Sequence, residues 1–353
     1  MERKLASIQV IRDIQPIPDA DAIEVATVNA WKVVVRRDEF KVGDLCVYFE
    51  IDSFLPIEPE FEFLRKACYR KMFTGDEGFR LKTVRLRKQL SQGLIMSIKD
   101  IYALYHRNCP NFEMGWFEGL DITEFLGVKK YEVEIPVQMS GIMKGPFPSF
   151  CVKSDEERIQ NLPNIITDYP AVRFYATEKL NGTSSMYFIN NSEFGVCSRN
   201  IQLLEDDINL YWKIAKKYDF EKKLKLLDLG YSNIAIQGEI IGPGIQSNKY
   251  KLSEPTFNLF SAFYIDTQKY ATYYELLKLA ELMDIQMVPI IALNIDLSNY
   301  TIDSLIKTAD GSSKLNYLQR REGLVYASMD TVEDTPFGKV SFKIVSNAFL
   351  EKE

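Results

Sequence analysis

Thr177-Glu178-Lys179-Leu180-Asn181-Gly182-Thr183 is the segment from which the rest of this chain can be interpreted. It follows an apolar, β-rich run that includes Val172, Phe174 and Tyr175, and its glycine lets the backbone turn. The pattern predicts a strand with one lysine at its exit. Such an amine attacks phosphorus once it is deprotonated, so we expect burial, a cation or a metal to lower its ordinary pKa of about 10.4.

Four further segments follow in order, and each joins a strand or a turn to a charged or polar side chain. They are Ser198-Arg199-Asn200, 236–244 with Glu239, 321–326 with Glu322, and 338–346 with Lys339 and Lys343. The ordered set resembles the motifs of the covalent nucleotidyltransferase superfamily, which contains polynucleotide ligases and messenger-RNA capping enzymes. Segments 178–182, 238–244 and 341–343 are most similar to ATP-dependent RNA ligases, within a match over about residues 150–350.

The resemblance implies that ATP adenylates the enzyme and that the AMP then activates a 5′-phosphate of RNA for sealing to a 3′-hydroxyl, as in RNA repair. Lys179 is then the nucleophile that forms lysyl–AMP. Lys343, helped by Lys339, contacts the α-phosphate, and Arg158 reaches the triphosphate. Positive charge around the phosphates favours this transfer, and the planar fork of arginine suits phosphate oxygens.

The same resemblance implies further contacts with the nucleotide and a metal. The nucleotide contacts are Glu178, Asn181, Gly182 and Arg199, with Glu239 at the ribose and Phe260 stacked on adenine. Glu322 is implied as a ligand of Mg²⁺ or Mn²⁺, and Glu239 as a second carboxylate for it. Magnesium uses only one or two protein carboxylates beside substrate phosphates, which suits a sequence without a dense acidic cluster. Phe257 and Phe263 are expected in the core.

Two positions depart from the family pattern. Asn181 stands where many members have aspartate, and an amide cannot neutralise a lysyl ammonium or bind metal as strongly. Ser341 stands where a second lysine often precedes the last motif lysine by two residues. Lys339, four residues before Lys343 and on the same strand face by parity, is the candidate to compensate.

Residues 1–105 predict a small β-barrel. Short apolar runs lie between turn residues at 5–11, 23–28, 31–36, 45–51, 79–86 and 93–98. No helical periodicity longer than two turns is recognised before Asp121. Segment 41–52 resembles the N-terminal OB-like module of one branch of RNA ligases, and OB-folds often bind oligonucleotides.

A basic segment lies inside this predicted barrel. Residues 65–88 contain nine Lys or Arg against two acids, although the whole chain has a formal net charge of −6. Dense positive charge attracts a phosphate backbone in a salt-dependent manner, and Tyr69, Phe73 and Phe79 could stack on bases. We expect RNA to contact this segment, and the alternative interpretation is a solvated charged surface.

The expected fold class is α+β, with the OB-like barrel followed by a two-sheet α+β nucleotidyltransferase domain. Residues 106–150 are interpreted as a connector and 151–353 as the adenylyltransferase domain. Helices are expected at 206–227, 273–283 and 302–318.

Composition excludes several other classes. The single histidine, His106, leaves little basis for a Ser-His-Asp hydrolase or a histidine-ligated zinc site. Five scattered cysteines indicate reduced thiols and an intracellular protein, and no signal peptide or apolar run of about 20 residues indicates secretion or a membrane. No P-loop pattern is present, so ATP would bind around the lysine. A monomer is expected.

Three alternatives remain open at this stage. A capping guanylyltransferase would use GTP, and a DNA ligase shares the chemistry. Enzymes of both kinds carry an OB domain after the last motif, whereas only ten residues follow Lys343 in this sequence. A nucleic-acid-binding protein with a decayed catalytic domain is the third, with Asn181 as its first sign. Covalent labelling by ATP, by GTP or by neither distinguishes them.

Overall fold

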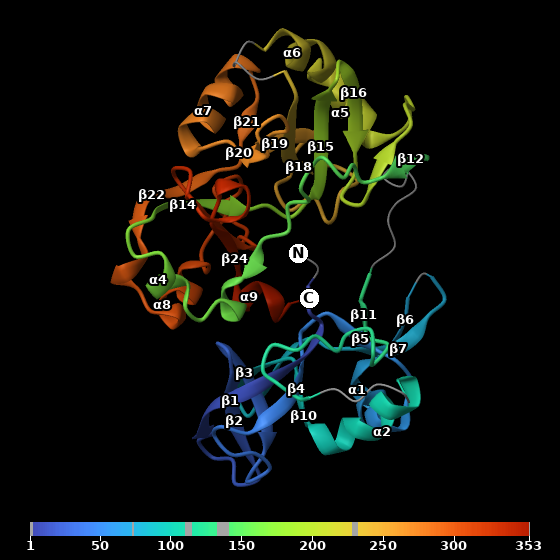
Figure 1. Ribbon diagram of the computed structural model, residues 1–353, viewed down its shortest axis with the longest axis vertical. Coiled ribbons are helices and arrows are strands. Elements are labelled where there is room, and N and C mark those ends of the chain that lie inside the picture. Colours follow the sequence, from blue (N-terminus) through green and yellow to red (C-terminus); the bar gives the residue numbers. More distant parts are fainter. Residues whose placement is uncertain (1–2, 73, 110–114, 133–140, 228–231, 353) are drawn as a thin grey trace. The chain divides into compact units, whose positions relative to one another are not determined.

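The computed structural model describes residues 3–72, 74–109, 115–132, 141–227 and 232–352 (Figure 1). Contacts divide the chain into two compact units, which are described separately. Unit 1 contains Met1–Glu134, Gln160–Pro163 and Leu350–Glu353, and unit 2 contains Ile135–Ile159 and Asn164–Phe349. Parts of the expected connector, 110–114 and 133–140, lie outside the described residues, and the boundaries at 105 and 150 stay a prediction.

Unit 1 is built on a curled sheet in the order β10-β4-β1-β2-β3. Its strands are β1 (Ala6–Pro16), β2 (Ile23–Val28), β3 (Trp31–Arg36), β4 (Leu45–Phe49) and β10 (Leu94–Ser97). The first half of β1 pairs with β4 and the second half with β2, with a bulge between Ile11 and Asp13. Because a bulge bends a strand, one long strand serves both sides of the curl.

The remaining elements of unit 1 surround this sheet. They are β5 (Ser53–Leu55), β6 (Tyr69–Lys71), β7 (Glu77–Arg80) and β11 (Lys129–Lys130) in a second sheet, the hairpin β8 (Thr83–Leu86) and β9 (Gln89–Gln92), and the helices η1 (Pro59–Leu64), α1 (Arg65–Cys68) and α2 (Ile98–Asn108). The expected single strand over 79–86 is therefore two strands. Phe79 is 0% exposed in the core, so the expectation that it stacks on bases is wrong. Phe73, expected to do the same, lies outside the described residues.

Helix α2 contradicts the expectation that no longer helix precedes Asp121. Ser97 caps it by accepting a hydrogen bond from the backbone N–H of Asp100. Ile101, Leu104 and Tyr105 are buried against the sheet. These positions have helical spacing, so the pattern was present in the sequence but lay at the edge of the supposed connector.

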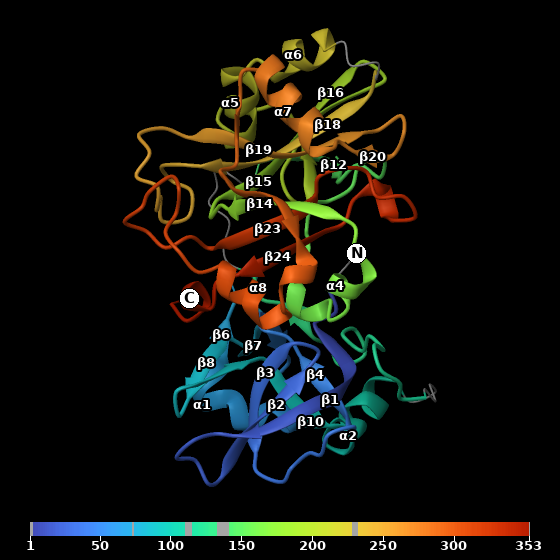
Figure 2. The ribbon, with the colours of Figure 1, turned by 90° about the vertical axis from the view of Figure 1, so that its left-hand side faces the viewer.

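Unit 2 contains an eight-stranded sheet in the order β12-β17-β16-β15-β18-β19-β20, with β21 also on β19. Its strands are β12 (Met143–Pro146), β15 (Thr183–Asn190), β16 (Glu193–Cys197), β17 (Ile201–Leu203), β18 (Ile234–Ile241), β19 (Thr256–Tyr264), β20 (Lys269–Tyr270) and β21 (Gln286–Met287). Helices α5 (Leu210–Lys217), α6 (Phe220–Leu226) and α7 (Tyr273–Leu282) pack on one face of it (Figure 2). A cluster that includes Tyr187, Phe220 and Phe257 fills the space between helices and sheet.

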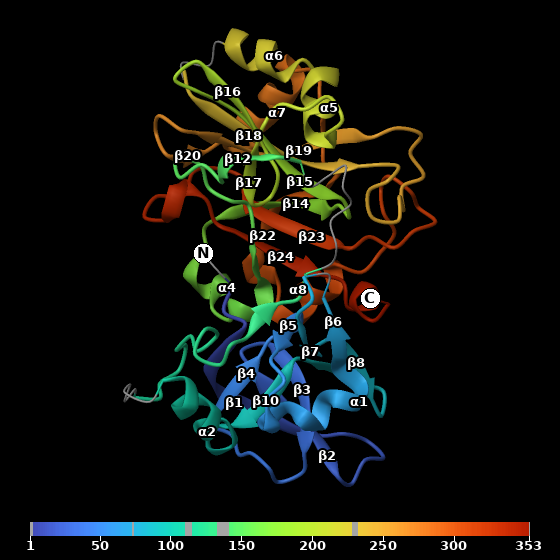
Figure 3. The same ribbon diagram turned by 90° about the vertical axis from the view of Figure 1, so that its right-hand side faces the viewer.

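The second sheet of unit 2 has the order β13-β24-β23-β14-β22 (Figure 3). Its strands are β13 (Glu157–Arg158), β14 (Arg173–Lys179), β22 (Ile290–Asp296), β23 (Gly323–Ser328) and β24 (Ser341–Val345). The shorter helices of this unit are α4 (Ile165–Asp168), α8 (Ile302–Thr308), η3 (Leu297–Asn299) and η4 (Pro336–Gly338). The connection from β14 to β15 carries the chain from this sheet into the eight-stranded one.

Two of the three predicted helices differ from the structure. The helix expected at 206–227 is divided into α5 and α6, because Asp219 adopts a left-handed conformation with φ 52°. The helix expected at 302–318 ends at Thr308, and Gly311 follows with φ 147°. Helix α7 agrees to within one residue with the prediction. In the described part of the chain, no helix is long and apolar enough to span a membrane.

Candidate active site

Lys179 is the last residue of β14, where the chain leaves one sheet of unit 2 for the other. It is paired in register with Gly323 at the start of β23, which brings the preceding residue, Glu322, next to it. The Lys179 ammonium donates a hydrogen bond to the Glu322 carboxylate. Asn181 Nδ2 donates to the second oxygen of the same carboxylate at 3.3 Å. The predicted nucleophile, the family-variant asparagine and the predicted metal ligand therefore form one contact group.

The turn after Lys179 lies tightly against β18. A Cβ on Gly182 would be 2.3 Å from the carbonyl oxygen of Ile240, so only glycine fits without a shift. The backbone N–H of Asn181 donates to the hydroxyl of Tyr250 at 2.7 Å. Ser184 on β15 pairs with Glu239 on β18, which brings this carboxylate into the same region. Tyr250 was missed by the sequence analysis because no local pattern connects it to the turn.

The charges around Lys179 are strongly coupled. Burial acts to lower the pKa of Lys179, but Glu322 and Glu239 outweigh it, and the pKa lies above its ordinary value. The side chains of the protein therefore raise the pKa of Lys179, and the expectation that they lower it is wrong. Burial raises the pKa of Glu239 to about 8, with Lys179 opposing the rise and Glu322 adding to it. If the negative charge of these two carboxylates were neutralised, the pKa of Lys179 would fall and the neutral amine would form more readily.

Lys343 and Arg158 come together through strand register. Lys343 pairs with Val325 on β23, and Arg158 on the short parallel strand β13 pairs with Lys343. Arg158 is only 6% exposed. Burial lowers the pKa of Lys343, Asp155 opposes that change, and Arg158 and Lys179 act in the same direction as burial. Two cations expected at the phosphates thus lie on neighbouring strands.

Asp155 joins Lys343, predicted at the α-phosphate, to Arg199, predicted as a nucleotide contact. Its Oδ1 accepts a hydrogen bond from Lys343 Nζ at 2.6 Å, and its Oδ2 accepts one from Arg199 Nη2 at 2.7 Å. Sequence analysis did not single out this residue, although it lies in the acidic run just before Arg158. The carboxylate therefore occupies the hydrogen-bonding positions that phosphate oxygens would need on both cations.

Lys339 lies apart from this contact. It precedes β24, so the expectation that it shares a strand face with Lys343 is wrong. Its Nζ is 3.4 Å from a Glu156 oxygen and 4.1 Å from the centre of the Tyr270 ring. Lys339 thus pairs with the acid that follows Asp155.

Glu178 and Phe260 complete the predicted set. Glu178 is 1% exposed, and its Oε2 accepts a hydrogen bond from the backbone N–H of Lys314 at 2.7 Å, so its side chain fastens a loop. Burial raises its pKa. Phe260 lies at a bulge of β19, half-buried against a cluster that contains Leu180. Phe257 and Phe263 are 0% exposed, as expected of core residues.

The site offers few ligands for a metal ion. Among the described residues, no group of three or more His, Cys, Asp or Glu side chains could hold one. Glu322 nevertheless has a side chain that is 13% exposed, beside the amide of Asn181. A single carboxylate with an amide oxygen fits Mg²⁺ or Mn²⁺ when substrate phosphates complete the shell, so the donor set agrees with the implied metal.

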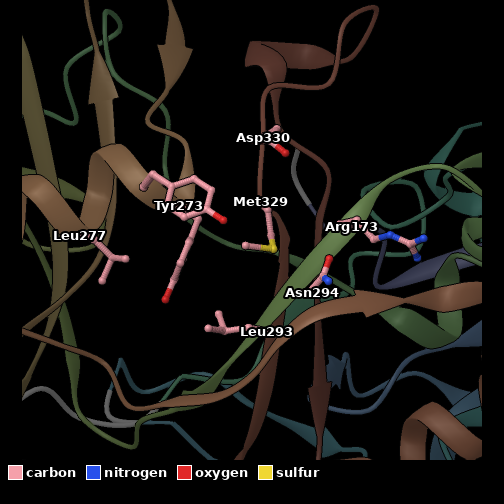
Figure 4. Close-up of a pocket in the computed structure, with 8 residues that line it drawn as sticks. Arg173, Tyr273, Leu277, Leu293, Asn294, Met329 and Asp330 are labelled. Atoms are coloured by element: carbon pink, nitrogen blue, oxygen red, sulfur yellow. The ribbon is translucent and has the colours of Figure 1, made fainter.

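A separate hollow of about 530 Å³ lies on unit 2 (Figure 4). Its lining residues are Arg173, Tyr273, Tyr274, Leu277, Leu293, Asn294, Met329 and Asp330. Tyr273 and Leu277 come from α7, and Leu293 and Asn294 from β22. None of the residues predicted for the nucleotide lines it, so geometry and charge, rather than the size of a cavity, identify the site at Lys179.

Comparisons with known proteins cover the whole chain. A family model described as RNA ligase matches residues 172–345, and one described as an OB-fold domain matches residues 5–98. The solved structure of Naegleria gruberi RNA ligase with pyrophosphate has 38% identity and a TM-score of 0.89, and the match covers 100% of this chain and 99% of that one. A lysine-to-alanine variant of that ligase with ATP and Mn has 37% identity and a TM-score of 0.88, with 99% of both chains covered.

A lysine-to-methionine variant with AMP and Mn is similar at 38% identity and a TM-score of 0.88, again over 99% of both chains. A search of curated proteins found no match.

Proposed function

The chain belongs to the RNA ligase family, and on this premise we propose that Lys179 is the residue that carries AMP in an ATP-dependent sealing reaction. The family resemblance predicted from the sequence is confirmed, as are the OB-like N-terminal fold and the α+β fold class. The capping and decayed-domain alternatives find no support in the comparisons. The observation that carries the proposal is the contact of Lys179 with Glu322, with Lys343 two strands away and Arg158 three strands away in the same sheet.

In the first step, the neutral Lys179 amine attacks the α-phosphorus of ATP. A nitrogen–phosphorus bond forms, the bond from the α-phosphorus to the bridging oxygen breaks, and pyrophosphate leaves with that electron pair. Lys343 faces charge that develops on the α-phosphate, and Arg158 holds the departing phosphates. Glu322 is the nearest acceptor for the proton that Lys179 must lose.

The carboxylates have complementary parts in this proposal. Glu322, with the Asn181 amide oxygen, would hold the divalent cation, which would supply positive charge beside the phosphates. Glu239 orients the ribose, and its raised pKa of about 8 means that it can donate as well as accept a hydrogen bond. Phe260 provides an apolar ring near Leu180 for the adenine.

In the second step, an oxygen of the RNA 5′-phosphate attacks the lysyl–AMP phosphorus, and the Lys179 nitrogen leaves. In the third, the RNA 3′-hydroxyl attacks the activated 5′-phosphorus, AMP leaves, and the phosphodiester is made. When the phosphorus–nitrogen bond breaks in the second step, the nitrogen takes up a proton and leaves as the amine. The same cations serve all three steps, because in each the phosphate oxygens around the reacting phosphorus carry the negative charge beside them.

We further propose that the basic segment 65–88 of unit 1 contacts the phosphate backbone of the RNA, in support of which it holds nine cations against two acids. We also propose an intracellular, monomeric protein. The five cysteines form no disulfide, and burial raises the pKa of Cys46 to about 12, which makes this thiol unreactive.

The test is covalent labelling with α-labelled ATP and a divalent cation, followed by denaturing electrophoresis. We expect the unaltered protein to take up label and K179M to take up none, because the accepting amine is absent. K213M is the matched control, since Lys213 is exposed on α5, and should be labelled normally. Label that persists in K179M would overturn the assignment, and absence of label in all folded proteins would overturn the adenylation itself.

A further inference from the structure

The hairpin β8–β9 of unit 1 is firmly held at its base. Ser91 and Gln92 are 4% and 3% exposed. The backbone N–H of Val34 donates to Ser91 Oγ at 3.0 Å, and the Tyr48 hydroxyl donates to the carbonyl of Gln92 at 3.1 Å. The hairpin is therefore a fixed projection from the curled sheet, since the buried end of β9 is bonded to both β3 and β4.

The tip of this hairpin consists of two consecutive cations. Leu86 pairs with Gln89, so Arg87 and Lys88 are the two residues of the turn. Their φ angles are 50° and 68°, the left-handed pair that a two-residue hairpin turn requires. Asn-Gly is the favoured occupant of such a turn, because long side chains are disfavoured at positive φ. Local backbone preference therefore does not account for the presence of Arg and Lys here.

The surroundings leave both side chains in solvent. Arg87 and Lys88 are exposed, and within the described residues neither side chain forms a hydrogen bond or an ion pair. Val84 and Leu86 beside them are 46% and 43% exposed. Arg85 holds the turn in place, because it donates to the carbonyl of Lys88 at 2.8 Å and to Glu351 at 2.6 Å.

Four other cations of the basic segment lie in ion pairs with acids. The ion pairs are Arg65–Glu62, Lys71–Glu77, Arg80–Asp52 and Arg85–Glu351. A cation that must leave an acid to meet a phosphate gains less than one that is held only by water. The basic segment is therefore not uniform, and the hairpin tip is where two consecutive cations form no ion pair in the described part of the chain.

We propose that Arg87 and Lys88 at the β8–β9 tip are the residues of unit 1 that grip the RNA phosphate backbone. The inference rests on the proposed function, of which it specifies the RNA-contacting site. Arg87 and Lys88 each contact a phosphate, and the exposed Leu86 and Val84 lie against the sugars between them. The turn needs no reordering on binding, since its geometry is held by Arg85, and pre-organisation of this kind favours affinity.

The test compares R87N/K88G with R65A/K71A in the full-length protein. Asn-Gly suits the left-handed turn better than Arg-Lys, so this double variant keeps the fold and removes only the two charged side chains. R65A/K71A removes the same charge from ion-paired positions of the same segment. The measurement is fluorescence anisotropy with a nicked RNA duplex that bears a 5′-phosphate, over a range of salt concentrations.

We expect R87N/K88G to weaken RNA binding on the order of tenfold and to reduce the salt slope by about 2, one for each lost phosphate contact. R65A/K71A should change affinity by about twofold or less, as exposed ion pairs contribute little. Unchanged binding by R87N/K88G, or an equal loss in both variants, would overturn the inference. An equal loss would mean that only total charge matters.

Covalent labelling with α-labelled ATP separates this inference from the proposed function. R87N/K88G should be labelled as the unaltered protein is, because the hairpin is not part of the nucleotide site. If the unaltered protein takes up no label, the proposed function fails. If it is labelled and R87N/K88G binds RNA normally, only the role of the hairpin fails.

Discussion

At the scale of single residues, Lys179 has charged neighbours that favour its protonated form. Glu322 and Glu239 keep its pKa above the ordinary value despite burial. Because attack on phosphorus needs the neutral amine, and the neutral fraction rises about tenfold per pH unit below the pKa, we predict that adenylation accelerates steeply with pH. The measurement is the single-turnover rate of AMP transfer from pH 6 to 9 at saturating ATP and Mg²⁺. A flat profile would contradict this account of the lysine.

Asp155 leads to a second prediction at this scale. Its carboxylate is bonded to both Lys343 and Arg199, two cations that the sequence predicted to contact the nucleotide. D155N keeps the size of the side chain and removes its charge, so we expect ATP to bind severalfold more tightly. Calorimetric titration with ATP measures the dissociation constant of D155N and of the unaltered protein. D303N, an acid in the first turn of α8, is the matched control and should bind ATP unchanged.

Weaker ATP binding by D155N, at an unchanged unfolding temperature, would show the reverse role. Asp155 would then be needed to orient Lys343 and Arg199, and competition with phosphate would be excluded as its main effect.

At the scale of elements, the pairing of β23 with β24 brings Glu322 and Lys343 into one sheet. Gly323 permits this pairing, because a Cβ there would lie 2.1 Å from the carbonyl oxygen of Ile344. We predict that G323A separates the two strands and lowers both the unfolding temperature and the yield of labelled enzyme. G145A is the control, since a Cβ on Gly145 would meet nothing within 4 Å. Normal labelling of G323A would show that the strand register tolerates the shift.

At the scale of the whole molecule, the chain does not divide into two continuous domains. Residues Gln160–Pro163, far along the sequence, belong to unit 1. Asn161 Oδ1 accepts a hydrogen bond from the Trp31 indole at 2.5 Å, and its Nδ2 donates to Glu50. Trp31 and Glu50 are 0% and 2% exposed, so both polar groups are cut off from water. This segment therefore completes the polar interior of unit 1.

We predict that N161A destabilises unit 1, because removing one partner of buried polar groups costs about 1–3 kcal/mol. Thermal unfolding followed by tryptophan fluorescence should show a midpoint lowered by several degrees. N108A is the control, because Asn108 donates only at the surface, to the carbonyl of Phe125 at 2.8 Å. Equal midpoints for N161A and the unaltered protein would show that water replaces the lost bonds.

Local pattern was sufficient for much of the fold. Strands β2 and β3 begin and end where the apolar runs and turn residues predicted, and α7 follows its helical spacing behind a Thr272 capping box. The family also followed from the order of short motifs around Lys179, Glu239, Glu322 and Lys343. Two predicted helices were too long, because the apolar pattern continued past the residues where the helices end, at Asp219 and after Thr308.

The amino-acid sequence by itself thus determined the chemistry: a lysine at a strand exit, followed in order by the carboxylates and cations that an adenylyl transfer uses. Only the tertiary structure decided which of these groups meet. Arg158 comes beside Lys343 through a parallel pairing across almost two hundred residues, and Asp155, three residues before Arg158, bonds Lys343 and Arg199 through its side chain. Register between distant strands, and the burial that sets each pKa, depend on packing of the whole unit, and no local pattern of residues encodes them.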